Sequence, residues 1–151
     1  MIQADQIKKL RDATGAPILR VKNVLEEVKG NEKKALEILK KEGFEKVAKR
    51  EGRATGQGKV FSYVHHSGKI AVLVELLSET DFVAKNALFE ELGKALALQI
   101  TSMDPKDVKE LEQQDFIKDP SKKILDLVKE VIAKTGENIK IGKFVRLEIG
   151  K

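Results

Sequence analysis

The chain has 151 residues, 41% of them hydrophobic and 5% aromatic, which is enough to bury the aliphatic core of one average domain or two small ones. It contains no cysteine, which excludes disulfides, thiol catalysis and thiolate metal sites. No apolar run reaches the roughly 18 residues of a membrane span, and residues 1–15 form a charged helical pattern rather than a secretory signal. We therefore expect a cytoplasmic protein with no membrane partner.

The net charge of +5 lies entirely in the first third of the chain. Residues 1–53 hold 14 Lys and Arg against 9 Asp and Glu, whereas residues 54–151 hold 15 of each. A basic segment favours an acidic partner, either a nucleic acid or an acidic protein surface, and mainly speeds encounter. The charges are interleaved along helical patterns, however, so a solvated helix surface explains them equally well.

Three short helices are predicted in residues 1–52, which we expect to form a basic three-helix module. Each is marked by a residue that favours a helix start and a glycine that favours an end. The predicted boundary residues are Asp5 and Gly15 for the first helix, Pro17 and Gly30 for the second, and Asn31 and Gly43 for the third. A bundle this small is marginally stable alone, so we expect it to pack against the next segment of the chain.

Residues 53–151 are predicted to form an α+β core and dimerisation domain. The boundary lies in the stretch GRATGQG, which holds three glycines in seven residues. Strand patterns follow at residues 59–66 and 69–77, and the short link Ser67-Gly68 between them favours a tight antiparallel hairpin. In the second strand Val72, Val74 and Leu76 alternate with other side chains and give one apolar face.

Three predicted helices and a last strand complete the core domain. Helical patterns are predicted at residues 86–103 and 105–112, and a further helix is expected to open at Asp119-Pro120 and to end at Gly136. Residues 138–149 alternate well enough to be a third strand. The sequence therefore predicts an N-terminal three-helix bundle followed by an α+β domain with a small three-stranded antiparallel sheet covered by helices.

No constellation of residues indicates an enzyme. The stretch GRATGQGK fails as a phosphate-binding loop, because its first glycine position holds Arg53 and its final Ser/Thr position holds Val60. His65 and His66 are adjacent, so on a strand they would point to opposite faces and could not chelate one ion. No two isolated carboxylates are placed for acid–base work. We expect no catalytic residue, no metal ligand and no cofactor.

Three blocks of sequence carry a resemblance to a known family. The blocks are Leu10-Arg11-Asp12-Ala13-Thr14-Gly15-Ala16, Thr80-Asp81-Phe82-Val83-Ala84-Lys85-Asn86 and Thr135-Gly136-Glu137-Asn138-Ile139. In their order and spacing they resemble the bacterial elongation factor Ts family, whose members exchange the guanine nucleotide of elongation factor Tu. Residues 36–49 also fit the end of the family's helical module, so the resemblance covers essentially the whole chain.

The chain departs from the family pattern at two places. The family usually has glycine and two methionines, then Asp-Cys, after its "TGA" segment, whereas Pro17-Ile18-Leu19-Arg20-Val21 stands here. Many relatives also carry a second core unit and a protruding helical hairpin, for which this chain has no room. It resembles the short form of the family, which implies a homodimer in which two subunits supply what one long chain supplies.

The resemblance implies an exchange tip made of Thr80, Asp81, Phe82 and Val83. In relatives the Asp-Phe pair enters the GTPase domain of elongation factor Tu beside its magnesium site. Phe82 would then be the wedge, Asp81 the acid near the metal's coordination network, and Thr80 and Val83 the residues that hold the tip in shape. This implies magnesium dislocation from the partner and promotion of GDP release during translation elongation.

A second contact with the partner is implied for the N-terminal module. In relatives this module touches a helix of the GTPase domain through the Arg of its first block and the apolar pair after "TGA". Carried over, these residues are Arg11, Ile18 and Leu19. The resemblance implies elongation factor Tu as the partner and no direct contact with nucleic acid.

Spacing alone leaves other interpretations open. Ser78 or Thr80 could simply cap the following helix, with Phe82 packing on Phe89 in the core. The alternative function is a non-catalytic binding module associated with the ribosome or the nascent chain, because the first three helices also resemble the ubiquitin-associated type of bundle. A charged module that bound ribosomal RNA would lose affinity steeply with salt.

Overall fold

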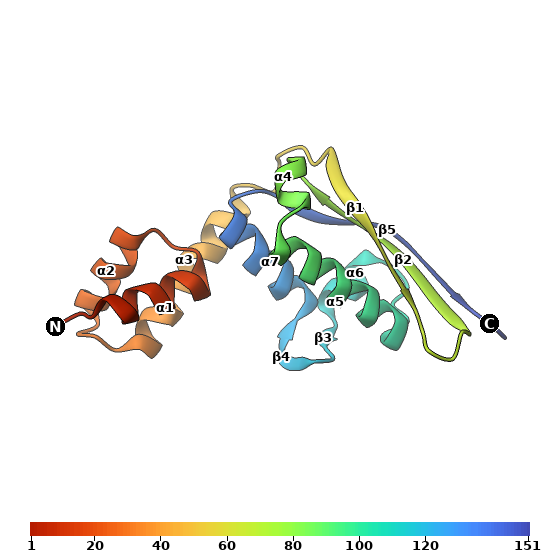
Figure 1. The fold of residues 1–151 in the computed structure, drawn as a ribbon, viewed down its shortest axis with the longest axis horizontal. Helices are drawn as coiled ribbons and strands as arrows, with labels where there is room; N and C mark the ends of the chain where they lie inside the picture. The colour runs from red at the N-terminus through yellow and green to blue at the C-terminus, as the bar shows by residue number, and fades with distance from the viewer.

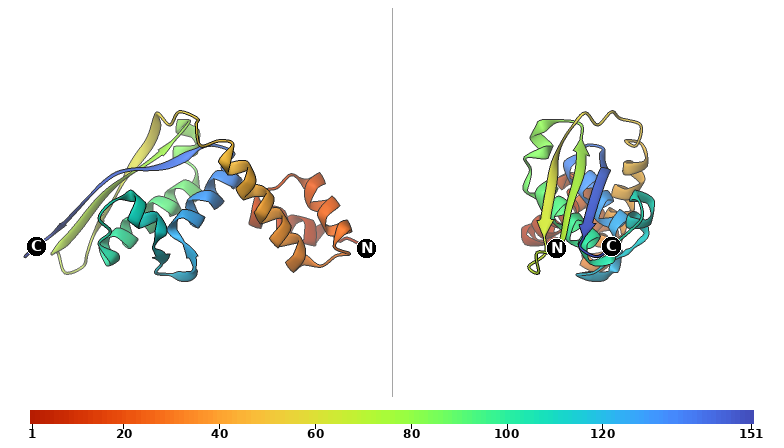
Figure 2. Two further views of the ribbon diagram at one scale, coloured as in Figure 1. Left: turned by 180° about the vertical axis from the view of Figure 1, so that it is seen from behind. Right: turned by 90° about the vertical axis from the view of Figure 1, so that its right-hand side faces the viewer.

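The computed structural model describes residues 1–151 and has two lobes (Figure 1). Three N-terminal helices form one lobe, and the rest of the chain forms a three-stranded antiparallel sheet with helices packed on one face. Figure 2 shows the strands in front of these helices, with the other face of the sheet uncovered. The predicted α+β class, with an N-terminal three-helix bundle, is confirmed.

The N-terminal lobe consists of α1 (Ala4–Thr14), α2 (Ile18–Glu27) and α3 (Glu32–Ala48). Three of the predicted boundary residues hold: Gly15 ends α1 in the left-handed conformation, Pro17 directly precedes α2, and the side chain of Asn31 caps α3. The prediction for Asp5 is wrong, because Gln3 is the N-cap of α1 and its N–H donates to the side chain of Gln6 at 3.1 Å. The lobe encloses a small aliphatic core of Leu10, Val21, Val24, Leu25, Ala35 and Leu39.

The third helix does not stop at Gly43, contrary to the sequence prediction. It continues to Ala48, and Val47 near its end is buried in the core of the second lobe. A Cβ on Gly43 would lie 3.4 Å from the Cβ of Ala133, so the helix passes close to α7 (Ile124–Thr135) here. Packing of this length of helix outweighs the weak tendency of one glycine to end it.

The sheet has the order β1-β2-β5, with β1 (Gln57–Val64), β2 (Ile70–Ser78) and β5 (Ile139–Glu148) all antiparallel. Its inner face is the predicted one, with Val72, Val74 and Leu76 buried. Direct partners in neighbouring strands point to the same face of a sheet. On the outer face of this sheet, several of these side chains are apolar and exposed. These are Val60, Val64, Leu73, Val145 and Leu147, each between 53% and 69% exposed.

The hairpin between β1 and β2 has a longer loop than predicted. The N–H of His65 donates to the carbonyl of Ile70, 2.9 Å away, so residues 66–69 form the loop rather than Ser67 and Gly68 alone. His65 and His66 lie beyond the end of β1, with ring centroids 4.1 Å apart, and not on opposite faces of a strand. The Nδ1 of His65 shares a hydrogen bond with Ser67 instead.

The inner face of the sheet is covered by α5 (Ala87–Met103), with α6 (Val108–Gln113) and α7 beside it. Phe89, Leu96 and Ile100 of α5 are fully buried there. Contrary to the sequence prediction, no helix begins at Asp119-Pro120. These residues lie in β4 (Asp119–Lys123), which pairs with β3 (Asp115–Phe116) in a second, two-stranded sheet.

The segment around β3 is held by one buried amide. The Nε2 of Gln99 donates to the carbonyl of Asp115 at 3.0 Å, and its Oε1 accepts from the N–H of Ile117 at 3.0 Å. The α7 helix begins only at Ile124, and the N–H of Lys123 just before it donates to the carboxylate of Asp126 at 2.9 Å. No helix of the protein is long and apolar enough to cross a membrane.

Candidate functional site

The predicted exchange tip forms a separate short helix, α4 (Asp81–Ala84), where the chain leaves β2. The Ser78 hydroxyl, buried at the end of β2, donates to the carbonyl of Thr80 at 2.8 Å. Thr80 is the N-cap, and its Oγ1 accepts from the N–H of Val83 at 3.4 Å. Val83 is buried beneath the turn, so this helix has one anchored side and one open side.

Phe82 lies on the open side and exposes 83% of its surface. The alternative in which it packs on Phe89 is wrong, because Phe89 is fully buried against Phe61, with ring centroids 6.0 Å apart. Asp81 is also exposed, and one of its carboxylate oxygens lies 3.8 Å from the Lys85 ammonium. An acid and an aromatic ring are thus presented together to the solvent.

Glu137 contacts this tip and was missed by the sequence reasoning. Its Oε1 accepts from the N–H of Thr80 at 3.0 Å, and its Oε2 accepts from the Thr80 hydroxyl at 2.7 Å. Glu137 belongs to the third block of the family resemblance, where it directly follows the glycine that ends α7. The signal that could have identified Glu137 is an acidic residue in a motif shared with the family, next to the end of a helix.

Asn138 and Arg53 connect the same region to the segment between the lobes. The buried Asn138 side chain donates from its Nδ2 to the carbonyl oxygens of Glu51, at 3.2 Å, and of Arg53, at 2.8 Å. The guanidinium of Arg53 lies 3.8 Å from the carboxylate of Glu79, just before the tip. The predicted division of the chain at residues 52/53 therefore falls within a bonded segment, and it stays a prediction.

The other predicted partner-binding residues lie on the N-terminal lobe. Ile18 and Leu19 open α2 and are 53% and 68% exposed, and Arg11 is exposed on α1. The departure from the family pattern has a structural account here. Arg20 turns toward α3, where its Nε lies 3.0 Å from Oε2 of Glu42, and the adjacent Val21 is buried in the helical core.

The two lobes meet where α1 approaches the end of α7. Gly15 has φ of 72°, and a Cβ there would lie 2.8 Å from the Cα of Lys134, so no other residue fits without a shift. The guanidinium of Arg50 donates to the carbonyl of Ile132 at 3.0 Å. The end of α7 thus contacts both the N-terminal lobe and, through Glu137, the tip.

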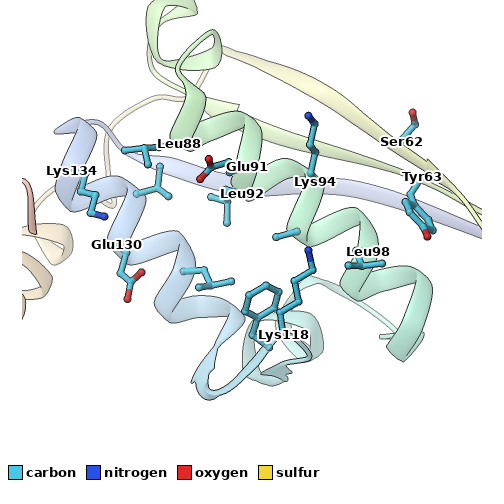
Figure 3. Close-up of a pocket in the computed structure, with 14 residues that line it drawn as sticks. Ser62, Tyr63, Leu88, Glu91, Leu92, Lys94, Leu98, Lys118, Glu130 and Lys134 are labelled. Carbon is cyan, nitrogen blue, oxygen red and sulfur yellow. The ribbon is translucent and has the colours of Figure 1, made fainter. Parts of the chain in front are cut away.

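A groove between α5 and α7 has a volume of about 720 Å³ (Figure 3). Most of its lining is apolar, and its charged lining residues include Glu91 and Lys94 from α5 and Glu130 and Lys134 from α7. Glu130 is paired with Lys122 at 3.0 Å. No three or more His, Cys, Asp or Glu side chains gather where they could hold a metal ion, in the groove or elsewhere.

Comparison with known proteins gives consistent matches along the chain. The family model described as elongation factor TS matches residues 79–151, which include the tip and Glu137. Elongation factor Ts of Leptospira biflexa is 41% identical, with 99% of this chain and 98% of the relative covered. Elongation factor Ts of Thermosipho melanesiensis is 37% identical, with both chains fully covered.

These relatives contain residues that this chain lacks. The alignment with the Thermotoga maritima protein, also named elongation factor Ts, is 39% identical over 193 positions and covers 99% of this chain. The chain has only 151 residues, so at least 42 of those positions have no counterpart here. The remaining matches still span both lobes, and the chain belongs to the elongation factor Ts family.

Proposed function

We propose that the protein is the guanine-nucleotide exchange factor for elongation factor Tu, acting in the cytoplasm during translation elongation. The observation that carries this proposal is the exposed Asp81-Phe82 pair on a capped helical turn. An aromatic side chain that is 83% exposed, above a turn whose Val83 is buried, is suited to insert into a partner.

Exchange would follow from insertion of the tip beside the nucleotide of the partner. Phe82 would displace the elements that hold the phosphates and magnesium, and Asp81 would perturb the coordination network of the metal. Because binding free energies are reciprocal, a factor that weakens GDP by some ratio is itself weakened by GDP in the same ratio. Burial of one phenylalanine supplies only about 1.5–3 kcal/mol, so contacts outside the tip must hold the complex.

Arg11, Ile18 and Leu19 are proposed to provide part of these contacts. The two apolar side chains are adjacent at the start of α2 and exposed, and α1 presents the arginine on the same lobe. The net charge of +5 in residues 1–53 would favour an acidic face on the partner and speed encounter.

We also propose that the protein is a homodimer that pairs through the outer face of its sheet. In one row across that face Leu73 lies between Ser62 and Val145, and in the next row Ala71 lies between Val64 and Leu147. An uncovered apolar face of this kind is typical of an interface. Pairing with an identical face about a two-fold axis would bury both at once.

The test is release of a fluorescent GDP from bacterial elongation factor Tu. The loaded partner is mixed in stopped flow with excess unlabelled GDP, with and without this protein over a range of concentrations. We expect a large acceleration that saturates with the protein. A release rate that does not change with a Tu of matching origin would refute the exchange function.

The salt dependence of binding separates this function from the alternative. The same protein is titrated with ribosomal RNA and with elongation factor Tu at low and moderate salt. Binding to RNA that exceeds binding to Tu at low salt and collapses between about 50 and 200 mM salt would favour a ribosome-associated module instead.

A further inference from the structure

We propose that Glu137 is the positioning residue of the exchange tip, an inference that rests on the exchange function proposed above. Its carboxylate, which comes from the turn after α7, fixes the N-cap residue of α4 and thereby the direction in which Asp81 and Phe82 point. Glu137 lies 57 positions further along the chain than Thr80. The tip is therefore held from outside its own segment.

The tip needs such support because it is too short to be stable alone. The α4 helix has four residues, and isolated helices of fewer than about 12 residues are marginal in water. Thr80 offers two donors, its N–H and its hydroxyl, and an ionised carboxylate is an acceptor-only group with two oxygens. Glu137 uses one oxygen for each donor, at 3.0 and 2.7 Å, and charge-assisted bonds of this kind are the stronger class.

The backbone around Glu137 is itself held in place by hydrogen bonds. Gly136 ends α7 in the left-handed conformation, and the N–H of Glu137 donates to the Thr135 hydroxyl at 3.4 Å. The next residue, Asn138, is 2% exposed and makes the two bonds to the segment between the lobes. The carboxylate is thus placed by neighbours on both sides.

The same helix end also holds the N-terminal lobe, through the contact between Gly15 and Lys134. Glu137 therefore connects the tip to the element that carries the second proposed contact with the partner. The Glu137 carboxylate bonds Thr80 and not the N-terminal lobe, so we expect its loss to leave Ile18 and Leu19 in place. We expect this loss to impair insertion of the tip more than formation of the complex.

The experiment measures GDP release from elongation factor Tu at increasing concentrations of the full-length protein and three variants. For E137A we expect the maximal release rate to fall at least tenfold, with less than about a threefold change in the concentration that gives half the maximum. E137Q keeps one acceptor oxygen and should lie between E137A and wild type.

E130A is the matched control, because it removes the same charge from α7, the helix that directly precedes the Glu137 turn. Glu130 pairs with Lys122 and makes no hydrogen bond to the tip. A readout without the partner is the hydrogen exchange of the Thr80 amide in the free protein. It should be faster in E137A than in wild type and unchanged in E130A, while the amides of the buried strand β2 keep their protection.

The outcomes separate the two proposals. If wild type accelerates release and E137A has the same maximal rate, or the Thr80 amide is unaffected, the positioning role is overturned and the exchange function stands. If E137A lowers the melting temperature and weakens complex formation as strongly as it lowers the maximal rate, Glu137 is a structural residue only. If wild type does not accelerate release, both proposals fail.

Discussion

Replacing Phe82 by alanine should separate function from stability, because the ring is in water in the free protein. Its surface is 83% exposed, so almost all of its burial would occur in the complex. Full burial of a phenylalanine is worth roughly 1.5–3 kcal/mol, and scaling by the exposed fraction gives roughly 1.2–2.5 kcal/mol. This corresponds to a loss of roughly 8- to 70-fold in kcat/KM for GDP release.

The matched control is Phe89→Ala, which removes the same ring from the core. Phe89 is 0% exposed, and its loss should lower the free energy of unfolding by about 3–5 kcal/mol. Urea unfolding should show that F82A leaves stability within about 0.5 kcal/mol of wild type, as for other exposed sites. The reasoning is refuted if F82A destabilises the free protein like F89A, or if stable F82A exchanges GDP at the wild-type rate.

Three further predictions concern the dimer, the junction of the lobes and the response to acid. Leu73→Asp places a charge in the middle of the outer sheet face and should convert a dimer to a monomer in sedimentation equilibrium; a dimer that survives would place the interface elsewhere. Gly15→Ala puts a Cβ 2.8 Å from the Cα of Lys134 at a φ of 72° and should lower the free energy of unfolding in urea by about 1–3 kcal/mol; unchanged stability would mean that the lobes do not pack there. The hydrogen bond from Arg20 holds the pKa of Glu42 below its ordinary value of 4.5. Stability from this pair is therefore full above that value and is lost as the pH falls through the lower folded-state pKa, so E42Q should flatten the acid side of the melting-temperature profile; an unchanged profile would contradict this.

The elements that could be predicted are those whose signals are local. Asn31 caps α3 with its own side chain, and Gly15 and Gly136 end helices in the left-handed conformation. The alternation of apolar side chains around Val74 is likewise a local signal, and it predicted which face of β2 is buried. Gly43 misled the prediction because its neighbour Ala133 is distant in sequence, and only packing on α7 shows why the helix continues.

The exposure of the proposed tip and its support by Glu137 could not be predicted from local patterns. Phe82 and Phe89 are seven residues apart, which on one helix would place them together. The chain breaks between them, because α4 ends at Ala84 and α5 begins at Ala87, and so the two rings face different surroundings. The contact between Glu137 and Thr80 joins two motifs far apart in the chain, and a local pattern contains no information on such a pairing.

The strand order β1-β2-β5 has a consequence for how the chain is made. The central strand, β2, ends at residue 78, and the strand that covers its second edge begins at residue 139. At about 5–20 residues per second, synthesis of the intervening sixty or so residues takes roughly 3–12 s. During that time a strand rich in valine and leucine has a bare hydrogen-bonding edge, which is the kind of template on which chains aggregate. Slower synthesis lengthens this interval, so yield of the folded protein should depend on translation rate and on chaperones that cover strand edges.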